Sequence, residues 1–230
     1  MTQHIVVAGS TGLVGTEVLA ALSDRPQCKV TALVRRLTKR TYPQHIRERA
    51  FDFSAPSDVD HVGTSTLPCD VLLCCIGTTI ATAGSRDAFQ KVDRDIPVGL
   101  AQALARHRAD AVFGLVSAIG AAQPRGFYLQ TKAAAEAAVI STGLRYVIVR
   151  PSLLLGDRQE FRFSEQLGGL LIRPLFGAVD LLGLSSLSAV ARVRPIQAKQ
   201  LARVLISACL DHPPTKGDIL EGQALFKAPP

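Results

Sequence analysis

The amino-acid sequence predicts an α/β fold built on a doubly wound parallel β-sheet. Short apolar runs rich in β-branched residues alternate with longer segments whose apolar residues recur at helical spacing. The apolar runs are nearly continuous over about five residues, which is typical of parallel strands buried on both faces. The alternation favours right-handed β-α-β crossovers, and the first run leads directly into a glycine-rich turn.

Six segments are expected to form strands of this sheet. In chain order they are His4–Ala8, Val30–Val34, Ala50–Phe53, Val71–Cys75, Val112–Val116 and Tyr146–Arg150. Helices are expected over Val14–Leu22, Ala88–His107, Thr131–Thr142 and Gln197–Leu210. Gly143 gives the third helix a natural end. This order of elements predicts a Rossmann-type domain.

The pattern becomes less regular after Arg150. Residues 151–183 are rich in Leu and Gly and predict loops with one helix, followed by a short strand at Arg192–Ile196 and a last strand at Ile219–Glu221. A chain of 230 residues fits a single domain, 1–230. Residues 151–230 are expected to form a small cap over the strand ends within that domain.

Composition and charge limit the possible functions. With 47% hydrophobic and 20% charged residues the chain is ordinarily globular, which excludes disorder. Much of the net charge of +7 lies between Arg35 and Arg49, where six Lys or Arg residues stand against one acid, Glu48. Such a stretch suits a nucleic acid or the phosphate of a cofactor. Because it carries one aromatic residue, Tyr42, and no RNA- or DNA-binding motif, nucleic acid is not expected.

The five cysteines predict neither a disulfide framework nor a metal site. They form no CxxC pair and no cluster with zinc spacing, so buried, reduced thiols are expected. The sequence opens on a short apolar strand rather than a signal peptide. Its least polar later stretch, Leu167–Ala191, is interrupted by charged residues and proline, which argues against a membrane-spanning helix. A cytoplasmic location is therefore expected.

The glycine-rich turn after the first strand predicts a dinucleotide site. Glycines at positions 9, 12 and 15 permit a tight turn and a close approach of the backbone to a pyrophosphate. The amide groups at the start of the following helix favour an anion. A plain turn between strand and helix is the alternative. The residues expected to bind the cofactor here are Gly9, Ser10, Thr11, Gly12, Leu13, Val14 and Gly15.

The end of the second strand favours NADPH over NADH. An acid there would bind the ribose hydroxyls of NADH, but this strand ends in Arg35-Arg36, whose guanidinium groups suit a 2′-phosphate. A solvated basic loop is the alternative reading. Further contacts are expected where the third and fourth strands end, although a purely structural role is equally open for each of these residues: Asp52, Phe53, Cys75, Ile76, Gly77 and Thr78.

Tyr128 and Lys132 form the candidate reaction centre. They are four residues apart and therefore share a helical face, and a nearby ammonium lowers a tyrosine pKa from about 10 toward the working range. Tyr128 is thus a candidate general acid for carbonyl reduction, and Ser117, after the fifth strand, a candidate hydrogen-bond donor to the same oxygen. Asp93 is expected to cap or pair on a helix, and Glu136 to be solvated or ion-paired.

These motifs together resemble the short-chain dehydrogenase/reductase superfamily, in particular an atypical branch similar to the Tat-interacting oxidoreductase-like proteins. The matching segments are 9–15, 74–79, 91–95, 128–132 and 150–160. The resemblance implies that Lys132 holds the nicotinamide ribose beside Tyr128, and that the loop from Leu154 to Arg162 closes over the cofactor. Leu154 and Arg162 are added as cofactor contacts on that basis, and Pro151, in the matching segment 150–160, is expected to contact the cofactor as well. The chain departs from many superfamily members in containing no asparagine.

The sequence is compatible with two functions. One is an NADPH-dependent reductase of a small or apolar carbonyl substrate, with the apolar region Leu167–Leu187 as the substrate wall. The other is an NADPH-binding scaffold or redox sensor with little or no turnover. The helix that carries Tyr128 and Lys132 often packs against its own copy in the resembled superfamily, so a homodimer is possible under either reading.

Overall fold

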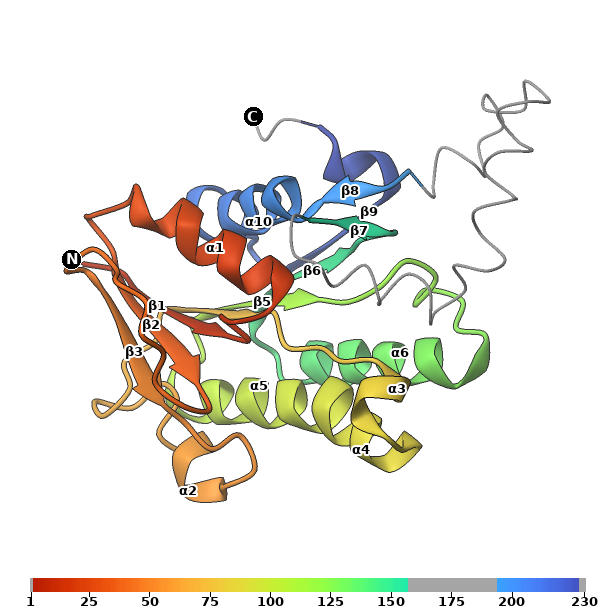
Figure 1. Cartoon of the computed structure of the whole chain (residues 1–230), viewed down its shortest axis with the longest axis horizontal. Helices are drawn as coiled ribbons and strands as arrows, with labels where there is room; N and C mark the ends of the chain where they lie inside the picture. Colours follow the sequence, from red (N-terminus) through yellow and green to blue (C-terminus); the bar gives the residue numbers. More distant parts are fainter. Residues whose placement is uncertain (1, 157–193, 228–230) are drawn as a thin grey trace.

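The computed structural model describes residues 2–156 and 194–227. Its centre is a seven-stranded sheet in the order β3-β2-β1-β4-β5-β6-β9, in which all neighbouring strands are parallel (Figure 1). The strands are β1 (His4–Ala8), β2 (Lys29–Val34), β3 (Ile46–Ala50), β4 (Val71–Cys74), β5 (Val112–Val116), β6 (Arg145–Arg150) and β9 (Gly217–Glu221). The predicted doubly wound α/β fold is confirmed.

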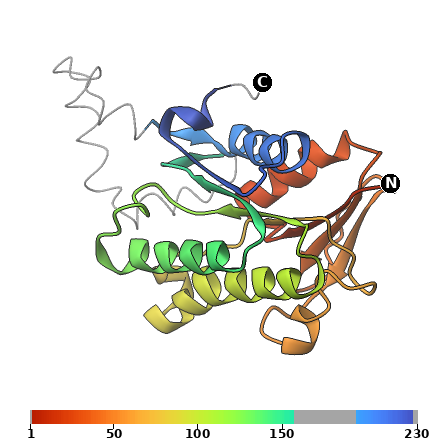
Figure 2. The same ribbon diagram turned by 180° about the vertical axis from the view of Figure 1, so that it is seen from behind.

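Helices cover both faces of the sheet (Figures 1 and 2). On one face lie α1 (Leu13–Ser23) and α10 (Ala198–Ile206), and on the other lie α5 (Ile96–His107) and α6 (Gly126–Ser141). Alternate residues of each strand point to opposite layers, so Ile5 and Val7 pack with α1 and α10, whereas Val6 and Ala8 pack with α5 and α6. These two buried layers explain why the central strands read as continuous apolar runs.

Short elements complete the described chain. They are α2 (Pro56–Val59), α3 (Ile80–Ala83), α4 (Arg86–Gln90), the π-helical turns η1 (Lys91–Asp95) and η4 (Ser207–Asp211), and the 3₁₀ turn η5 (Gly222–Leu225). The five cysteines all fall within the described residues and are free thiols, four of them buried and Cys75 partly exposed. Among the described residues, no helix combines the length and the apolar character needed to cross a membrane.

Five of the six predicted strands agree with the structure to within one residue, but the third does not. The prediction placed it at Ala50–Phe53, whereas β3 is Ile46–Ala50. Because β3 is an edge strand, it carries Arg47, Glu48 and Arg49 and lacks the apolar run of a central strand. Phe51 is buried and follows β3 directly. Its apolar side chain explains why the predicted strand begins where β3 ends.

The helix predicted over Ala88–His107 is a composite of α4, η1 and α5. The interruption has a local cause: Pro97 has no N–H to donate to the carbonyl of Asp93 four residues earlier. The helix widens there by one residue, and the N–H of Ile96 bonds to the carbonyl of Lys91, the spacing of a π-helix. This turn places Asp93 in the interior, where its residue is only 2% exposed.

The described residues of the C-terminal segment contribute a helix and a strand to the main α/β layers, and they also form two short strands of their own. The helix α10 packs against α1, and β9, which contains the predicted last strand, extends the sheet beside β6. The short strands β7 (Leu154–Leu155) and β8 (Ile196–Gln197) pair with each other, so the predicted strand at Arg192–Ile196 begins too early. The helix expected within 151–183 and the apolar wall at Leu167–Leu187 lie outside the described residues.

Candidate functional site

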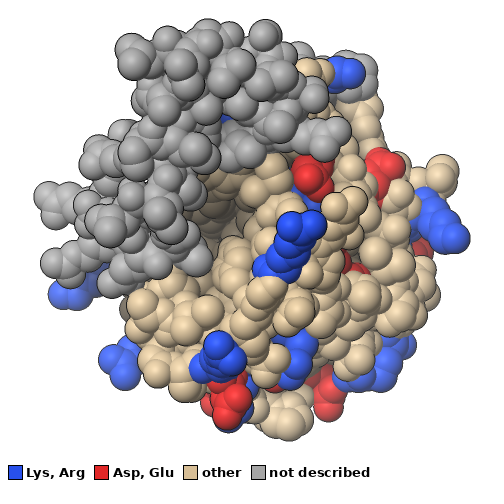
Figure 3. Space-filling view, turned by 90° about the vertical axis from the view of Figure 1, so that its right-hand side faces the viewer, with Lys and Arg blue, Asp and Glu red and all other residues tan. Residues whose placement is uncertain are grey.

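The candidate residues come together at the carboxyl ends of the parallel strands, the edge where open α/β sheets bind ligands. Figure 3 looks onto this side of the molecule, which is hollowed beside the grey residues. The visible walls of the hollow are largely uncharged, and a Lys or Arg side chain stands beside it. The turns after β1, β2, β4 and β5 supply the groups described below.

The glycine turn after β1 leaves no room for a Cβ at Gly9 or Gly15. Gly9 has a left-handed φ of +79°, and a Cβ on it would lie 2.6 Å from the carbonyl carbon of Cys75. A Cβ on Gly15 would lie 2.2 Å from the carbonyl oxygen of Gly9. Gly12 is the N-cap of α1 and has no side chain with which to cap the helix. The turn therefore offers the first amide groups of α1 to an anion.

Ser10 and Arg40 connect the glycine turn to the segment that follows β2. The Ser10 side chain is buried, and its hydroxyl donates to the carbonyl oxygen of Leu33 at 3.2 Å, so it braces the turn from inside. Arg35 and Arg36 follow β2 directly and are exposed. A guanidinium nitrogen of Arg40 lies 3.4 Å from the Thr16 hydroxyl in the first turns of α1. Sequence reasoning counted Arg40 in the basic stretch but did not place it at the glycine turn.

Glu48, the one acid of that basic stretch, is hydrogen-bonded to the loop after β2. Both carboxylate oxygens of Glu48 accept from Thr38, one from the backbone N–H at 2.6 Å and the other from the hydroxyl at 2.5 Å. The hydroxyl of Tyr42 lies 3.3 Å from the same carboxylate. Glu48 thus fixes the loop after β2 and leaves Arg35 and Arg36 as the charged groups at the strand end.

The loop after β4 joins the glycine turn to the candidate reaction centre. Gly9 packs against the backbone of Cys75 and Ile76 at the start of this loop. A Cβ on Gly77 would lie 3.4 Å from a carboxylate oxygen of Asp93 and 3.7 Å from the ammonium nitrogen of Lys132. The backbone N–H of Thr78 donates to the other Asp93 oxygen at 2.9 Å. The predicted residues 75–78 thus stand between the glycine turn and α6.

Lys132 pairs with Asp93 inside the protein. The Lys132 nitrogen lies 2.7 Å from Asp93 Oδ1, and the two side chains are 8% and 1% exposed. Tyr128 precedes Lys132 by one helical turn of α6, and its ring centroid lies 5.6 Å from that of Phe89. The structure brings Tyr128 and Lys132 to one face, as predicted, and adds Asp93 to them. The sequence marked Asp93 only as a residue that caps or pairs on a helix.

The Tyr128 pKa moves opposite to the direction that the sequence predicted. Burial raises the pKa of Tyr128 above its usual value of 10.0, while Lys132 lowers it and Asp93 raises it, and burial outweighs the ammonium. Burial also opposes the charge on Lys132, but Asp93 and Tyr128 more than offset that cost and raise the pKa of Lys132. Tyr128 is therefore a protonated phenol at neutral pH, beside a charged lysine.

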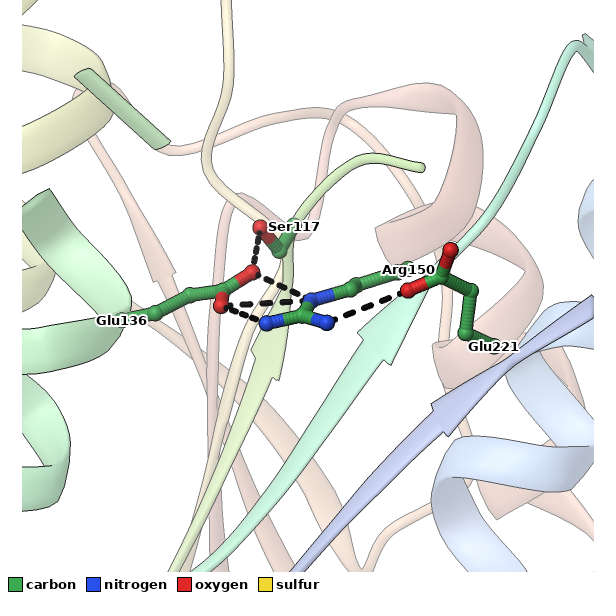
Figure 4. Close-up of polar contacts among 4 residues, drawn as sticks. All are labelled: Ser117, Glu136, Arg150 and Glu221. Atoms are coloured by element: carbon green, nitrogen blue, oxygen red, sulfur yellow. Dashed lines mark hydrogen bonds and ion pairs between the residues drawn. The ribbon is translucent and has the colours of Figure 1, made fainter. Parts of the chain in front are cut away.

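Ser117 belongs to a different buried cluster, in which Figure 4 shows Glu136 between Ser117 and Arg150. The Ser117 hydroxyl donates to Glu136, and Arg150 donates to both oxygens of that carboxylate, at 2.6 Å for the shortest contact. Arg150 also contacts Glu221 of β9 at 3.1 Å. Of the two expectations for Glu136, a solvated or an ion-paired side chain, the second is confirmed. Since the single proton of Ser117 is engaged, its predicted donation to a carbonyl would require this bond to break.

Three of the remaining predicted contacts, Asp52, Phe53 and Pro151, lie within the described residues. The Asp52 carboxylate accepts the N–H of Ser54 at 2.8 Å, and Phe53 is half-buried against Phe51. Pro151 is buried, and its carbonyl accepts the N–H of Ile119 at 2.9 Å. Arg162 lies outside the described residues.

Leu154 and Leu13 lie where the chain after β6 returns to the glycine turn. Leu154 is half-buried in β7. Two residues later, a Cβ on Gly156 would lie 2.3 Å from a methyl group of Leu13, which opens α1. The chain after β6 therefore contacts the helix start next to the turn, at the position where the resemblance implies a covering loop.

Comparison with known proteins agrees with this geometry. A family model described as NAD(P)H-binding matches residues 9–167. Protein FMP52 of Candida albicans is 30% identical over 203 residues, 87% of this chain and 85% of that protein. Protein HTATIP2 of Rattus norvegicus is 34% identical over 184 residues, 77% of this chain and 72% of that protein. These matches confirm the resemblance to the Tat-interacting oxidoreductase-like proteins.

Solved structures confirm the fold. ElxO with NADP bound has a TM-score of 0.69 and 14% sequence identity, and the match covers 99% of this chain and 100% of that one. MoeE5 in complex with UDP-glucuronic acid and NAD also has a TM-score of 0.69 at 14% identity, covering 95% of this chain and 76% of that one. At this level of identity the likeness concerns the arrangement of strands and helices.

The expected cytoplasmic location is contradicted by the relatives. The FMP52 proteins of Candida albicans, Scheffersomyces stipitis and Saccharomyces cerevisiae are all named mitochondrial. The prediction took the lack of a recognisable secretory signal as evidence for the cytoplasm. That lack does not distinguish between compartments, so it could not support a location in the cytoplasm.

Proposed function

The chain belongs to the NAD(P)H-binding family, and we propose that it is an oxidoreductase that uses NADPH to reduce a small or apolar carbonyl substrate. One observation carries the proposal: an unbroken run of contacts leads from the glycine turn to Lys132. Gly9 abuts the backbone of Cys75 and Ile76, and Gly77 in the same loop lies beside Asp93 and Lys132. A dinucleotide with its pyrophosphate at the turn would extend along this loop toward Tyr128.

The residues present fit a dinucleotide. Gly9 and Gly15 let the turn close tightly on its own backbone and on that of Cys75, where a Cβ would clash, and α1 presents its first amide groups at this turn. The amides and the glycines would hold the pyrophosphate, and Lys132 would donate to the ribose at the reactive end. When bound, the cofactor supplies a hydride. The side chains of this chain would supply the proton and would stabilise the charge that forms when the proton leaves.

The charges at the end of β2 support NADPH rather than NADH. Arg35 and Arg36 are exposed at the strand end, and Arg40 approaches the first turns of α1. Glu48, the acid of this stretch, is bound to Thr38 and lies within β3, not at the end of β2 where the acid of an NAD site stands. This cluster of arginines also accounts for the basic stretch without a nucleic acid.

Tyr128 is the proposed general acid. Its hydroxyl is protonated at neutral pH because burial raises its pKa, so it can give a proton to the carbonyl oxygen as the carbon accepts the hydride. The resulting phenolate would face the ammonium of Lys132, one helical turn away, which stabilises that negative charge. Proton and hydride together convert the carbonyl to an alcohol. The Ser117–Glu136 pair would orient the strand end beside this oxygen.

Replacing Tyr128 by Phe tests the proposal. Oxidation of NADPH over a panel of aldehydes and ketones should fall at least a hundredfold in Tyr128→Phe, because general acid catalysis contributes about 10²–10⁴-fold. Calorimetric binding of NADPH should change little. Tyr146→Phe is the matched control, since Tyr146 lies in β6 outside the site and its variant should keep wild-type rates.

A second function, an NADPH-binding scaffold or redox sensor, is favoured by one observation. The Ser117 proton is held by Glu136, so Ser117 does not present a free donor to a carbonyl. If the wild type binds NADPH but transfers hydride to no member of a broad carbonyl panel, the scaffold replaces the reductase. If Tyr128→Phe retains wild-type turnover, Tyr128 is not the acid.

A further inference from the structure

Asp93 is the buried carboxylate that contacts the candidate reaction centre. We propose that Asp93 is a positioning residue, which holds the Lys132 side chain in place and keeps it in the charged, ammonium form. The role of that ammonium toward cofactor and phenolate rests on the function proposed above. The holding of the charge by Asp93 rests on the geometry of the chain alone.

The geometry fixes both oxygens of Asp93. Oδ1 lies 2.7 Å from the Lys132 nitrogen, and Oδ2 accepts the backbone N–H of Thr78 at 2.9 Å. Asp93 thereby ties three elements together: the π-turn η1, the loop after β4 and the helix α6. The ammonium is held next to Gly77, at the position where the loop after β4 passes the site.

The π-turn is what allows this contact. Pro97 breaks the α-helical hydrogen bonding one turn later, and the bond from Ile96 to Lys91 makes the wider turn in which Asp93 faces inward. The neighbouring Asp95 faces outward instead, with 49% of its side chain exposed and its carboxylate 2.7 Å from Arg94. Two aspartates of one turn therefore differ completely in burial.

Lys132 depends on Asp93 for its charge. Its residue is 7% exposed, and among the residues that the structure describes the other ionisable groups that face it, Tyr128 and Cys74, are neutral at neutral pH. Glu136, one turn further along α6, is bound by Arg150 and Ser117. A buried lysine without a counter-charge loses its proton at a pKa up to 3–5 units below that of a free lysine. Without Asp93, Lys132 would become a neutral amine and could no longer stabilise a phenolate.

The test follows the ammonium of Lys132 directly. In the full chain with ¹⁵N-labelled lysine, without cofactor or substrate, the Lys132 ammonium resonance is assigned by its loss in Lys132→Arg. In the wild type it should persist to pH 10, because the pKa of Lys132 is raised. In Asp93→Asn, which keeps the size of the side chain, the midpoint of the Lys132 titration should fall by about two pH units or more.

Asp95→Asn is the matched control, because it removes the same charge from the same turn without touching Lys132. It should leave the Lys132 titration at the wild-type midpoint. An unchanged midpoint in Asp93→Asn, or an equal shift in Asp95→Asn, overturns the proposal. If Asp93→Asn does not fold, the wild-type titration decides, and a Lys132 side chain that is a neutral amine at neutral pH overturns the proposal.

A parallel calorimetric titration with NADPH separates this proposal from the function. If Lys132 contacts the ribose as an ammonium, Asp93→Asn should bind NADPH at least tenfold more weakly than Asp95→Asn. Should the wild type bind no NADPH while the Lys132 midpoint still falls in Asp93→Asn, the proposed function fails and the role of Asp93 stands. The reverse result, NADPH binding with an unchanged midpoint, overturns the role of Asp93 alone.

Discussion

At the scale of single residues, the site is governed by how the half-buried Tyr128 and the buried Lys132 hold their protons. Tyr128 and Lys132 lie on one face of α6, as their spacing predicts, but the spacing says nothing of the solvent around them. Burial raises the pKa of Tyr128, and Asp93 balances part of the lysine charge. The side chain that a short motif marks as reactive is thus set to give a proton rather than to take one.

The absence of tryptophan makes the first prediction easy to measure. The chain has three tyrosines and no tryptophan, so tyrosinate absorbance near 295 nm is free of overlap. The difference between wild type and Tyr128→Phe should show a phenol that titrates above pH 10.0, because burial disfavours the phenolate. Because the pKa of Tyr128 is raised in the folded state, its contribution to stability is complete below the pKa of an unfolded tyrosine. That contribution is lost as the pH rises through the folded-state pKa. A difference titration below pH 10.0 would show that Lys132 outweighs burial.

Ser117 and Asp93 show what residue-level prediction lacks. Ser117 follows a strand and precedes Tyr128, so its sequence position suits a donor, yet its hydroxyl is bound to Glu136. Asp93 is 39 positions before Lys132, and no local pattern marks two such distant residues as partners. Both outcomes depend on contacts between separate elements, which sequence spacing does not encode.

At the scale of elements, the turn between β1 and α1 is the part most tightly specified by the sequence. Gly15→Ala should weaken NADPH binding at least tenfold and destabilise the fold, because its Cβ would lie 2.2 Å from the Gly9 carbonyl oxygen. Gly99→Ala in α5 is the matched control: its Cβ meets Val59 at 3.8 Å, an ordinary contact. That variant should gain up to about 1 kcal/mol of stability from helix propensity.

Calorimetry with NADPH and chemical denaturation of both variants check this prediction. Wild-type NADPH affinity in Gly15→Ala would show that the cofactor does not approach this turn. A loss of stability in Gly99→Ala as large as in Gly15→Ala would show that the fold tolerates no added methyl group in either helix.

The elements that the sequence predicted well are those with a repetitive signal. The buried strands β1 and β5 read as apolar runs and were located to the residue. The edge strand β3 has polar side chains, and the π-turn η1 arises from a missing N–H at Pro97, so neither has a periodic pattern to detect. A short apolar stretch predicts the strand β9, but the sequence does not indicate that this strand pairs with β6.

At the scale of the whole molecule, the cluster of Ser117, Glu136, Arg150 and Glu221 joins the centre of the fold to its C-terminal strand. Arg150→Met removes the partner of Glu136, whose residue is 3% exposed, and leaves that carboxylate buried. Breaking such a pair costs about 3–5 kcal/mol, so the free energy of unfolding should fall by about that amount.

Glu221→Gln is the control for this cluster. It loses only the outer contact at 3.1 Å, where the carboxylate side chain is 31% exposed, and should cost less than about 1 kcal/mol. Urea unfolding at neutral pH measures both variants. Equal costs in the two variants would mean that the buried Glu136–Arg150 pair is not what joins α6 to β6.

The central claim, that this chain binds NADPH through the arginines after β2, is tested most directly by calorimetric titration of NADPH and NADH. The wild type should bind NADPH at least tenfold more tightly, and Arg35→Ala/Arg36→Ala should lose most of that preference while NADH affinity changes little. Lys29→Ala/Arg47→Ala removes two exposed charges, one at the amino end of β2 and one within β3, and should keep the preference. Equal losses for NADPH and NADH in the arginine variant would contradict the claim.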